Sequence, residues 1–285
     1  MAREAVAFID RHREHPFFLY LAFNAVHTPL EATDERLQRF AAIEDKTRRT
    51  YAAMLTALDE AVGHVLEKLR ASGLEENTLI FFFSDNGGPV MPGTSINGSR
   101  NAPLRGSRRT TLEGGVRVPF VIQWKGKLPA GRTYDQPVIQ LDVQPTALAA
   151  AGVSISPDWK LDGVDLLPYL TDQQLGSPHE RLFWRLGQQR AIRQGEWKLV
   201  QYDTNADLST SETRTASLTG RPAVTPPRLY NLAADVGEAN DLAAAHPGKV
   251  QELDAAWQAW SAEQATPLWG PPQFTAPSPA PDAKK

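Results

Sequence analysis

At residues 79–88 the chain reads Leu-Ile-Phe-Phe-Phe-Ser-Asp-Asn-Gly-Gly. The first five residues form an unbroken apolar run, which is typical of a strand covered on both faces, as in a parallel sheet between helices. Asp85 and Asn86 fall where this strand must end, and Gly87-Gly88 allows the backbone to turn at once. Ligands of open α/β sheets bind beyond the carboxyl ends of the strands. The stretch therefore predicts an α/β fold with a ligand site at this end.

Asp85 and Asn86 together offer one carboxylate and one carboxamide oxygen. Hard oxygen donors of low total charge favour calcium or magnesium over zinc or copper, and of the first two calcium is the better match. The alternative is a simple turn in which these side chains bond their own backbone, and it is the commoner outcome for such a dipeptide. Other parts of the chain are needed to decide between the two.

A second apolar run, at residues 17–23, also ends in polar residues and is followed by His27. The pKa of histidine lies near neutrality, so His27 could protonate a leaving oxygen or donate to an anion, although a lone histidine is more often structural. Between the two runs, residues 46–72 carry apolar side chains at helical spacing, and Gly73 fits a left-handed stop. Strand, helix and strand predict a right-handed βαβ unit.

Residues 87–115 are rich in glycine, serine, asparagine and proline, with no periodicity, and a loop of this length is usually functional or disordered. The segment also carries several arginines. The guanidinium group of an arginine matches a tetrahedral oxyanion, so these residues could bind an anion, and Glu113 could hold one of them in place. The alternative to an anion site is a basic loop exposed to solvent. The arginines in and just after this loop are Arg105, Arg108, Arg109 and Arg117.

The rest of the chain predicts a strand at 116–124 and a helix capped by Asp142 that ends at Gly152. After about residue 155, short runs separated by glycines predict an antiparallel sheet, followed by a helix at 247–263. The predicted strands lie at 182–186, 189–193, 196–201 and 228–230. We expect a larger α/β domain over 1–160, a small α+β subdomain over 161–266, a mobile loop at 203–227, and a disordered Pro/Ala-rich tail over 267–285.

Composition narrows the class of protein. The net charge of −3 gives no sign of nucleic-acid binding, and no apolar run is long enough to span a bilayer. The first residues lack the apolar core of a secretory signal. The chain has no cysteine, which excludes disulfides, thiolate metal sites and a cysteine nucleophile within it.

Several short motifs occur in an order and spacing that resemble the carboxyl-terminal part of the formylglycine-dependent (type I) sulfatases, members of the alkaline-phosphatase-like superfamily. The resemblance covers nearly the whole chain except the loop at 203–227 and the tail. Each motif is weak singly, and their order makes the resemblance specific. They are His27-Thr28-Pro29, Ser84-Asp85-Asn86-Gly87, Pro103-Leu104-Arg105-Gly106, Glu113-Gly114-Gly115, Asp142 with Pro145-Thr146, Trp197-Lys198-Leu199-Val200 and Leu229-Tyr230-Asn231-Leu232.

The resemblance implies a calcium-dependent hydrolase of sulfate monoesters, acting on aryl or carbohydrate esters, with a periplasmic or extracellular location. In that family a Cys or Ser in a C/S-x-P-S-R motif becomes the formylglycine nucleophile. Carried over by position, Asp85 and Asn86 are metal ligands, and His27 contacts the sulfate or protonates the leaving oxygen. Arg108 stands where the family usually has a lysine, and is expected to contact the substrate.

The C/S-x-P-S-R motif does not occur in this sequence, nor does the paired-Asp segment that supplies further metal ligands. Calcium takes six to eight oxygen ligands, and a metal cannot replace the nucleophile of the covalent step. We therefore expect an incomplete alkaline-phosphatase-like fold, with a mostly parallel sheet between helices and half an active site that is inactive alone. The alternatives are a phosphoryl or phosphonate ester hydrolase of the same superfamily and a non-catalytic anion-binding remnant.

Overall fold

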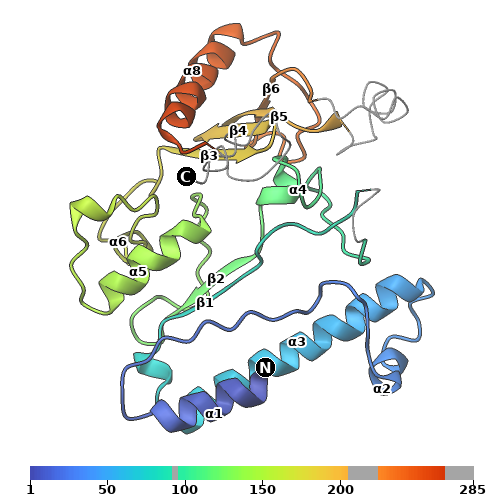
Figure 1. Cartoon of the computed structure of the whole chain (residues 1–285), viewed down its shortest axis with the longest axis vertical. Coiled ribbons are helices and arrows are strands. Elements are labelled where there is room, and N and C mark those ends of the chain that lie inside the picture. Colours follow the sequence, from blue (N-terminus) through green and yellow to red (C-terminus); the bar gives the residue numbers. More distant parts are fainter. Residues whose placement is uncertain (92–95, 205–223, 267–285) are drawn as a thin grey trace, which may run out of the picture. The chain divides into compact units, whose positions relative to one another are not determined.

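The computed structural model describes residues 1–91, 96–204 and 224–266. The chain divides into two compact units (Figure 1), which are described separately. Unit 1 contains Met1–Asp85, Ser95–Arg100 and Val118–Glu180, and unit 2 contains Asn86–Thr94, Asn101–Arg117 and Arg181–Lys285. The domain boundaries predicted from the sequence stay predictions, and the tail at 267–285 and most of the loop at 203–227 lie outside the described residues.

Unit 1 begins with a layer of helices (Figure 1). Helix α1 (Ala2–His12) and the short α2 (Asp34–Gln38) both contact the long α3 (Lys46–Ala71). Helix α3 begins after Asp45, whose side chain accepts a hydrogen bond from the Arg48 amide, and ends before Gly73, where φ is +69°. The helical spacing and the stop signal in the sequence thus gave the correct helix.

The strand predicted at 79–83 and the strand predicted at 116–124 both form, as β1 (Ile80–Phe83) and β2 (Phe120–Gln123). They pair antiparallel, with Phe82 opposite Val121. These two side chains are 44% and 55% exposed, so this sheet face is not covered within the described residues. The expected mostly parallel sheet is not confirmed, because every strand pairing in the described part of the chain is antiparallel.

The apolar run at 17–23 is extended but belongs to no strand in the structure, so the expected βαβ unit is wrong for this part of unit 1. Phe18 is 77% exposed and Tyr20 78%, while Phe17 and Leu19 are partly covered. An apolar run indicates a segment that favours burial, but a strand also needs a partner in register. The sequence pattern indicates the tendency to burial, but it does not indicate whether a partner strand is available.

The remaining elements of unit 1 are short helical pieces. Asp142 stands at the start of α5, as predicted, but its carboxylate does not cap that helix. Instead it accepts hydrogen bonds from the amides of Ile139 (2.8 Å) and Val164 (2.9 Å) and contacts the His179 ring. The pieces are η1 (Glu75–Asn77), η2 (Gln140–Asp142), α5 (Val143–Ala150), η3 (Pro157–Trp159) and α6 (Leu167–Leu170).

Unit 2 is built on the predicted small antiparallel sheet, with strand order β3-β4-β5-β6 (Figure 1). The strands are β3 (Arg181–Leu186), β4 (Gln189–Gln194), β5 (Trp197–Gln201) and β6 (Arg228–Asn231). Helix α8 (Pro247–Glu263) covers one face with Leu253 and Trp257. The other face packs against Leu112, which lies in the arginine-rich loop just before α4 (Glu113–Val116).

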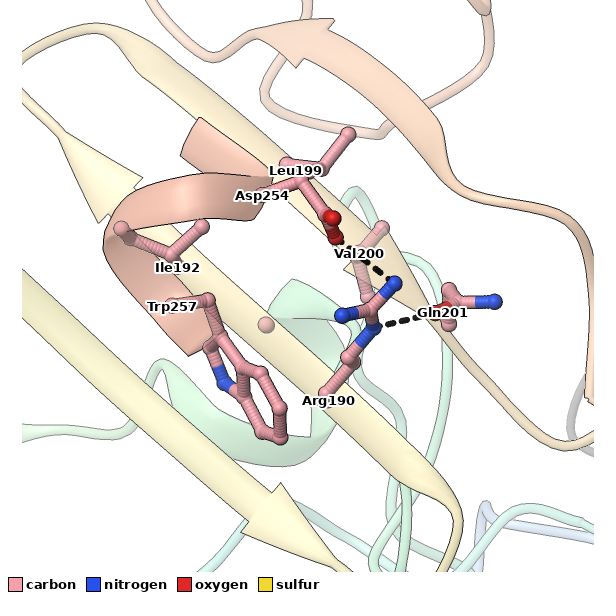
Figure 2. A pocket seen from close by; sticks show the side chains of 8 residues that line it. Arg190, Ile192, Leu199, Val200, Gln201, Asp254 and Trp257 are labelled. Atoms are coloured by element: carbon pink, nitrogen blue, oxygen red, sulfur yellow. Dashed lines mark hydrogen bonds and ion pairs between the residues drawn. The ribbon is translucent and has the colours of Figure 1, made fainter. Parts of the chain in front are cut away.

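A small hollow between β4, β5 and α8 encloses about 10 Å³ (Figure 2). Arg190 crosses it, donating to Asp254 at 2.7 Å and to Gln201, with its guanidinium 5.1 Å from the centre of the Trp257 ring. A space of this size holds about one water. It is part of the packing of α8 on the sheet and is too small for a substrate.

Candidate active site

The Asn-Gly-Gly turn after β1 lies against the Glu-Gly-Gly motif of the arginine-rich loop, within unit 2. The Gly87 amide donates to the carbonyl of Gly115 at 3.0 Å. A Cβ atom at Gly87 would lie 1.7 Å from the carbonyl oxygen of Gly114. Gly87 is therefore required by a close backbone contact as well as by the turn.

Arg108 is tied to the same turn through its backbone. Its amide donates to the carbonyl of Gly88 at 3.1 Å. The Asn101 side chain accepts from the Gly88 amide and donates to the carbonyls of Gly88 and Gly106, at 2.9–3.0 Å. The structure thus brings two predicted site residues, Asn86 and Arg108, into one hydrogen-bonded loop assembly.

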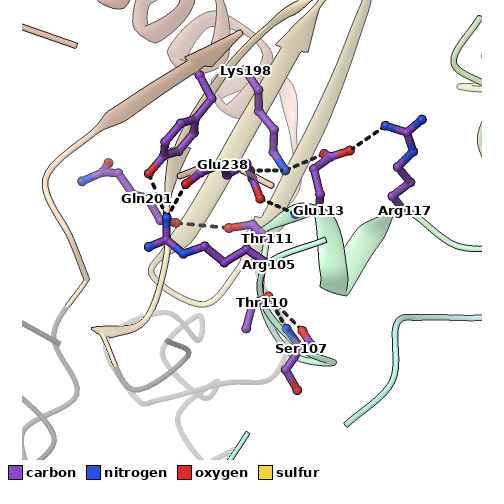
Figure 3. A network of polar contacts seen from close by, with 10 residues as sticks. Arg105, Ser107, Thr110, Thr111, Glu113, Arg117, Lys198, Gln201 and Glu238 are labelled. Atoms are coloured by element: carbon purple, nitrogen blue, oxygen red, sulfur yellow. Dashed lines mark hydrogen bonds and ion pairs between the residues drawn. The ribbon is translucent and has the colours of Figure 1, made fainter. Parts of the chain in front are cut away.

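A buried charge cluster anchors this assembly to the sheet of unit 2 (Figure 3). Lys198 on β5 lies 2.7 Å from a carboxylate oxygen of Glu113 and 2.9 Å from one of Glu238. The other Glu238 oxygen accepts from the Glu113 amide at 2.7 Å. All three side chains are nearly inaccessible to solvent. The Glu-Gly-Gly motif is therefore fixed by ion pairs as well as by main-chain contacts.

Two buried carboxylates share one ammonium group in this cluster. Burial lowers the pKa of Lys198, but the attraction of the two glutamates reverses this, and the pKa lies above its ordinary value. Burial raises the pKa of Glu113, and Lys198 outweighs it, so that pKa is lowered. For Glu238 burial dominates, Lys198 offsets only part of it, and the pKa is raised. The two buried glutamates thus share the positive charge of a single ammonium group, and their pKa values shift in opposite directions.

Glu113 also lies 3.6 Å from Arg117, which confirms that it holds one arginine of the loop. The principal partner of Glu113 is Lys198, which was not among the predicted site residues. The Trp-Lys-Leu-Val motif predicts that this lysine lies on a strand, but it does not indicate which residue the lysine contacts. Arg105 was expected among the anion-binding arginines. It instead donates to the carbonyl of Glu238 and to the hydroxyls of Tyr202 and Tyr230, which is a structural arrangement.

The other two predicted site residues lie in unit 1. His27 is exposed, and its Nδ1 is 2.7 Å from the carbonyl oxygen of Thr28. A carbonyl only accepts, so the hydrogen of the neutral ring lies on Nδ1 and the lone pair on Nε2. The carbonyl of the neighbouring Val26 accepts from buried Asn97 at 2.8 Å, which holds this turn in place.

Asp85 lies two residues beyond Phe83, the last residue of β1. The Ser84 amide still donates to Pro119 at 3.2 Å, and the Gln140 side chain donates to the carbonyls of Ser84 (2.9 Å) and Asp85 (3.1 Å). Across the described residues, no group of three or more acidic or histidine side chains could enclose a metal ion. Asp85 and Asn86 offer two of the six to eight oxygen ligands that calcium takes, and their role as metal ligands stays a prediction.

His27 and Asp85 belong to unit 1, and Asn86 and Arg108 to unit 2. The structure describes how each is held within its own unit. The convergence of all four on one anion stays a prediction.

Comparison with known proteins decides the family. The family model described as Sulfatase matches residues 1–153. The chain belongs to the sulfatase family. A relative named Uncharacterized sulfatase YdeN, from Escherichia coli K12, is 40% identical over 185 residues, covering 64% of this chain and 32% of that protein. Rat steryl-sulfatase is 32% identical over 262 residues, covering 85% of this chain and 44% of that enzyme.

Solved structures show the same fold. The PsFucS1 sulfatase from Pseudoalteromonas sp. superposes with a TM-score of 0.74 and 23% identity, over 92% of this chain and 51% of that one. The crystal structure titled Ps i-CgsB superposes with a TM-score of 0.79 and 33% identity, over 94% of this chain and 55% of that one. This sulfatase chain spans about half the length of that structure, and less than half the length of the two relatives above. The fold class predicted from the sequence is thus confirmed as that of the sulfatases, while its parallel core is not.

Proposed function

We propose that this chain supplies one part of the active site of a sulfatase, which hydrolyses sulfate monoesters. The observation that carries the proposal is the hydrogen-bonded assembly of the Asn-Gly-Gly turn with the arginine-rich loop. It ties the backbone of Arg108, a potential anion ligand, to Gly88, which lies two residues after the potential cation ligand Asn86. A sulfate ester bound to a cation needs both kinds of group.

Asp85 and Asn86 would hold calcium, which would supply positive charge for a sulfate oxygen. The Nδ2 of Asn86 donates to the carbonyl of Gly87 at 2.9 Å, so Oδ1 is the atom of this side chain suited to a cation. The fork of donors on Arg108 would bind the sulfate. His27, when protonated, would donate its Nε2 hydrogen to the leaving alcohol oxygen.

The formylglycine of the family has no counterpart in this sequence, which contains neither cysteine nor a C/S-x-P-S-R motif. No step through such a group is derived for this chain. Reading the gene upstream of the codon for Met1 tests where the nucleophile comes from. An in-frame C/S-x-P-S-R supports an active sulfatase, and a stop codon followed by unrelated sequence supports the non-catalytic anion-binding remnant.

Hydrolysis of phosphate or phosphonate esters is the rival activity, since Arg108 replaces the lysine that the resemblance leads us to expect. Parallel assays with 4-nitrophenyl sulfate, 4-nitrophenyl phosphate and phenylphosphonate esters, on the natural protein that carries this chain, separate the two. We expect turnover of the sulfate. Preference for the phosphorus esters would overturn the proposal. Replacement of His27 by alanine should lower kcat by about 10²–10⁴-fold, the usual contribution of a general acid.

Sulfated carbohydrates are our proposed substrate class, ahead of aryl sulfates. One solved neighbour, 33% identical to this chain, is titled as a complex with k-i-k-neocarrahexaose, and another relative is named N-acetylgalactosamine-6-sulfatase. None of the helices in the described residues has the length and hydropathy needed to cross a bilayer. A periplasmic or extracellular location remains part of the proposal, and fractionation of the native cells tests it.

A further inference from the structure

We propose that Gln140 is a positioning residue for Asp85. Its side-chain amide donates to two successive carbonyl oxygens, those of Ser84 at 2.9 Å and Asp85 at 3.1 Å. All three residues lie in unit 1. The inference rests on the proposed role of Asp85 as a metal ligand and assigns the group that fixes its backbone.

The need for such a group follows from where the sheet ends. The β1–β2 pairing stops at Phe83 opposite Phe120, and one further bond joins the Ser84 amide to Pro119. Beyond that point the backbone forms no further hydrogen bonds of the β1–β2 ladder. Gln140 restrains it instead, because each of its two amide hydrogens can be donated to one of the carbonyls of Ser84 and Asp85. The direction of the Asp85 side chain is set by this short piece of backbone.

Gln140 is itself held by a rigid support. It begins the short helix η2, and Asp142 in the same helix is fully buried, with its carboxylate accepting from the Ile139 and Val164 amides. The ring nitrogen Nε2 of His179 lies 2.9 Å from both oxygens of that carboxylate. Three chain segments therefore converge on one acid beside the glutamine.

Close backbone packing completes the support. A Cβ atom at Gly163 would lie 2.0 Å from the carbonyl oxygen of Leu141, so the segment before Val164 lies directly on η2. A side chain on a support of this kind loses little freedom when it forms its bonds, which makes it an effective partner for a ligand-bearing turn.

A positioning role and a purely structural role predict different measurements. If Gln140 only stabilised unit 1, its loss would lower the melting temperature of the calcium-free chain. If it orients Asp85, its loss lowers calcium affinity while the calcium-free chain keeps its melting temperature. Loss of groups that orient metal ligands typically costs about 10–100-fold in affinity.

The test compares three variants of the natural protein that carries this chain. Gln140→Met keeps the length of the side chain and removes the donor, Gln173→Met makes the same change at an exposed glutamine of the same unit, and Asp85→Asn alters the ligand itself. Calcium binding is measured by titration calorimetry and by the luminescence of terbium as a calcium substitute, and melting is followed without metal. We expect Gln140→Met to lose about 10–100-fold in affinity with unchanged melting, and Gln173→Met to match the wild type.

The possible failures are distinct. If Asp85→Asn abolishes calcium binding and Gln140→Met leaves it unchanged, the inference is wrong and the proposed function stands. If Gln140→Met lowers the metal-free melting temperature, or loses no more affinity than Gln173→Met, the residue is structural. If the wild type binds neither calcium nor terbium, or Asp85→Asn binds them equally well, the metal assignment fails and the positioning role fails with it.

Discussion

Replacing Lys198 by methionine should destabilise unit 2 strongly. The ammonium group lies within 2.9 Å of both Glu113 and Glu238, and its removal leaves two carboxylates buried together without a cation between them. Breaking a buried ion pair by removing one partner costs about 3–5 kcal/mol, and here one lysine serves two acids. At about 2–4 °C per kcal/mol, this corresponds to a fall of roughly 6–20 °C in the melting temperature.

The cost should depend on pH. Because the pKa of Glu238 is already raised by burial, loss of Lys198 raises it further and lets the acid protonate as the pH falls. The destabilisation should therefore shrink between neutral pH and about pH 5. Urea unfolding followed by tryptophan fluorescence, at both pH values, measures this difference.

The matched control is Lys249→Met on helix α8. Lys249 pairs with Glu252 at 2.6 Å, but both side chains are partly exposed, at 29% and 44%. Such a pair contributes about 0–1 kcal/mol. If Lys198→Met unfolds at the same urea concentration as Lys249→Met, the cluster does not anchor the loop and the reasoning fails.

Further predictions concern both units. Hydrogen bonds, first from Arg36, lower the pKa of Glu60 from 4.5 to about 2, so the stability from this pair is complete above pH 4.5 and is lost as the pH falls toward 2; an acid melting series should show this loss in the wild type and not in Glu60→Gln. Gly87→Ala should disrupt the turn, since its Cβ would meet the Gly114 carbonyl, and a sulfate or calcium titration should show weaker binding. Gly63→Ala, within α3 and with nothing near its Cβ, should instead stabilise the chain by about 1 kcal/mol, and a melting curve that shows the opposite order would contradict both.

The helices and the small sheet could be predicted from the sequence because their signals are local. Helical spacing and Gly73 gave α3, and glycines between short apolar runs gave the four strands of unit 2. The direction of pairing could not be predicted. The run at 79–83 indicates burial for either a parallel or an antiparallel partner. The run at 17–23 also indicates burial, but no strand in the described residues pairs with it.

For the candidate site, too, local features could be predicted from the sequence and long-range contacts could not. Roles for His27, Asp85 and Asn86 could be predicted from the sequence because each follows an apolar run in a motif, and these roles stay predictions. The contacts that fix the surrounding backbone could not, since Lys198 and Glu113 are separated by 85 positions and Gln140 and Asp85 by 55. Contacts between residues so far apart in the chain produce no periodic or compositional pattern in the sequence. Pairings of this kind become visible only in three dimensions.

The hydrogen bonds that hold the loop around Arg108 involve the main chain of that residue, and this bears on which side chains position 108 can carry. The loop is joined to its neighbours through the Arg108 amide, the Gly88 carbonyl and the Gly106 carbonyl, none of which depends on the side chain at position 108. Exchange of lysine and arginine at this position leaves these main-chain donors and acceptors unchanged. On the proposed role of Arg108, anion selectivity could therefore change at this position while these main-chain bonds stay in place.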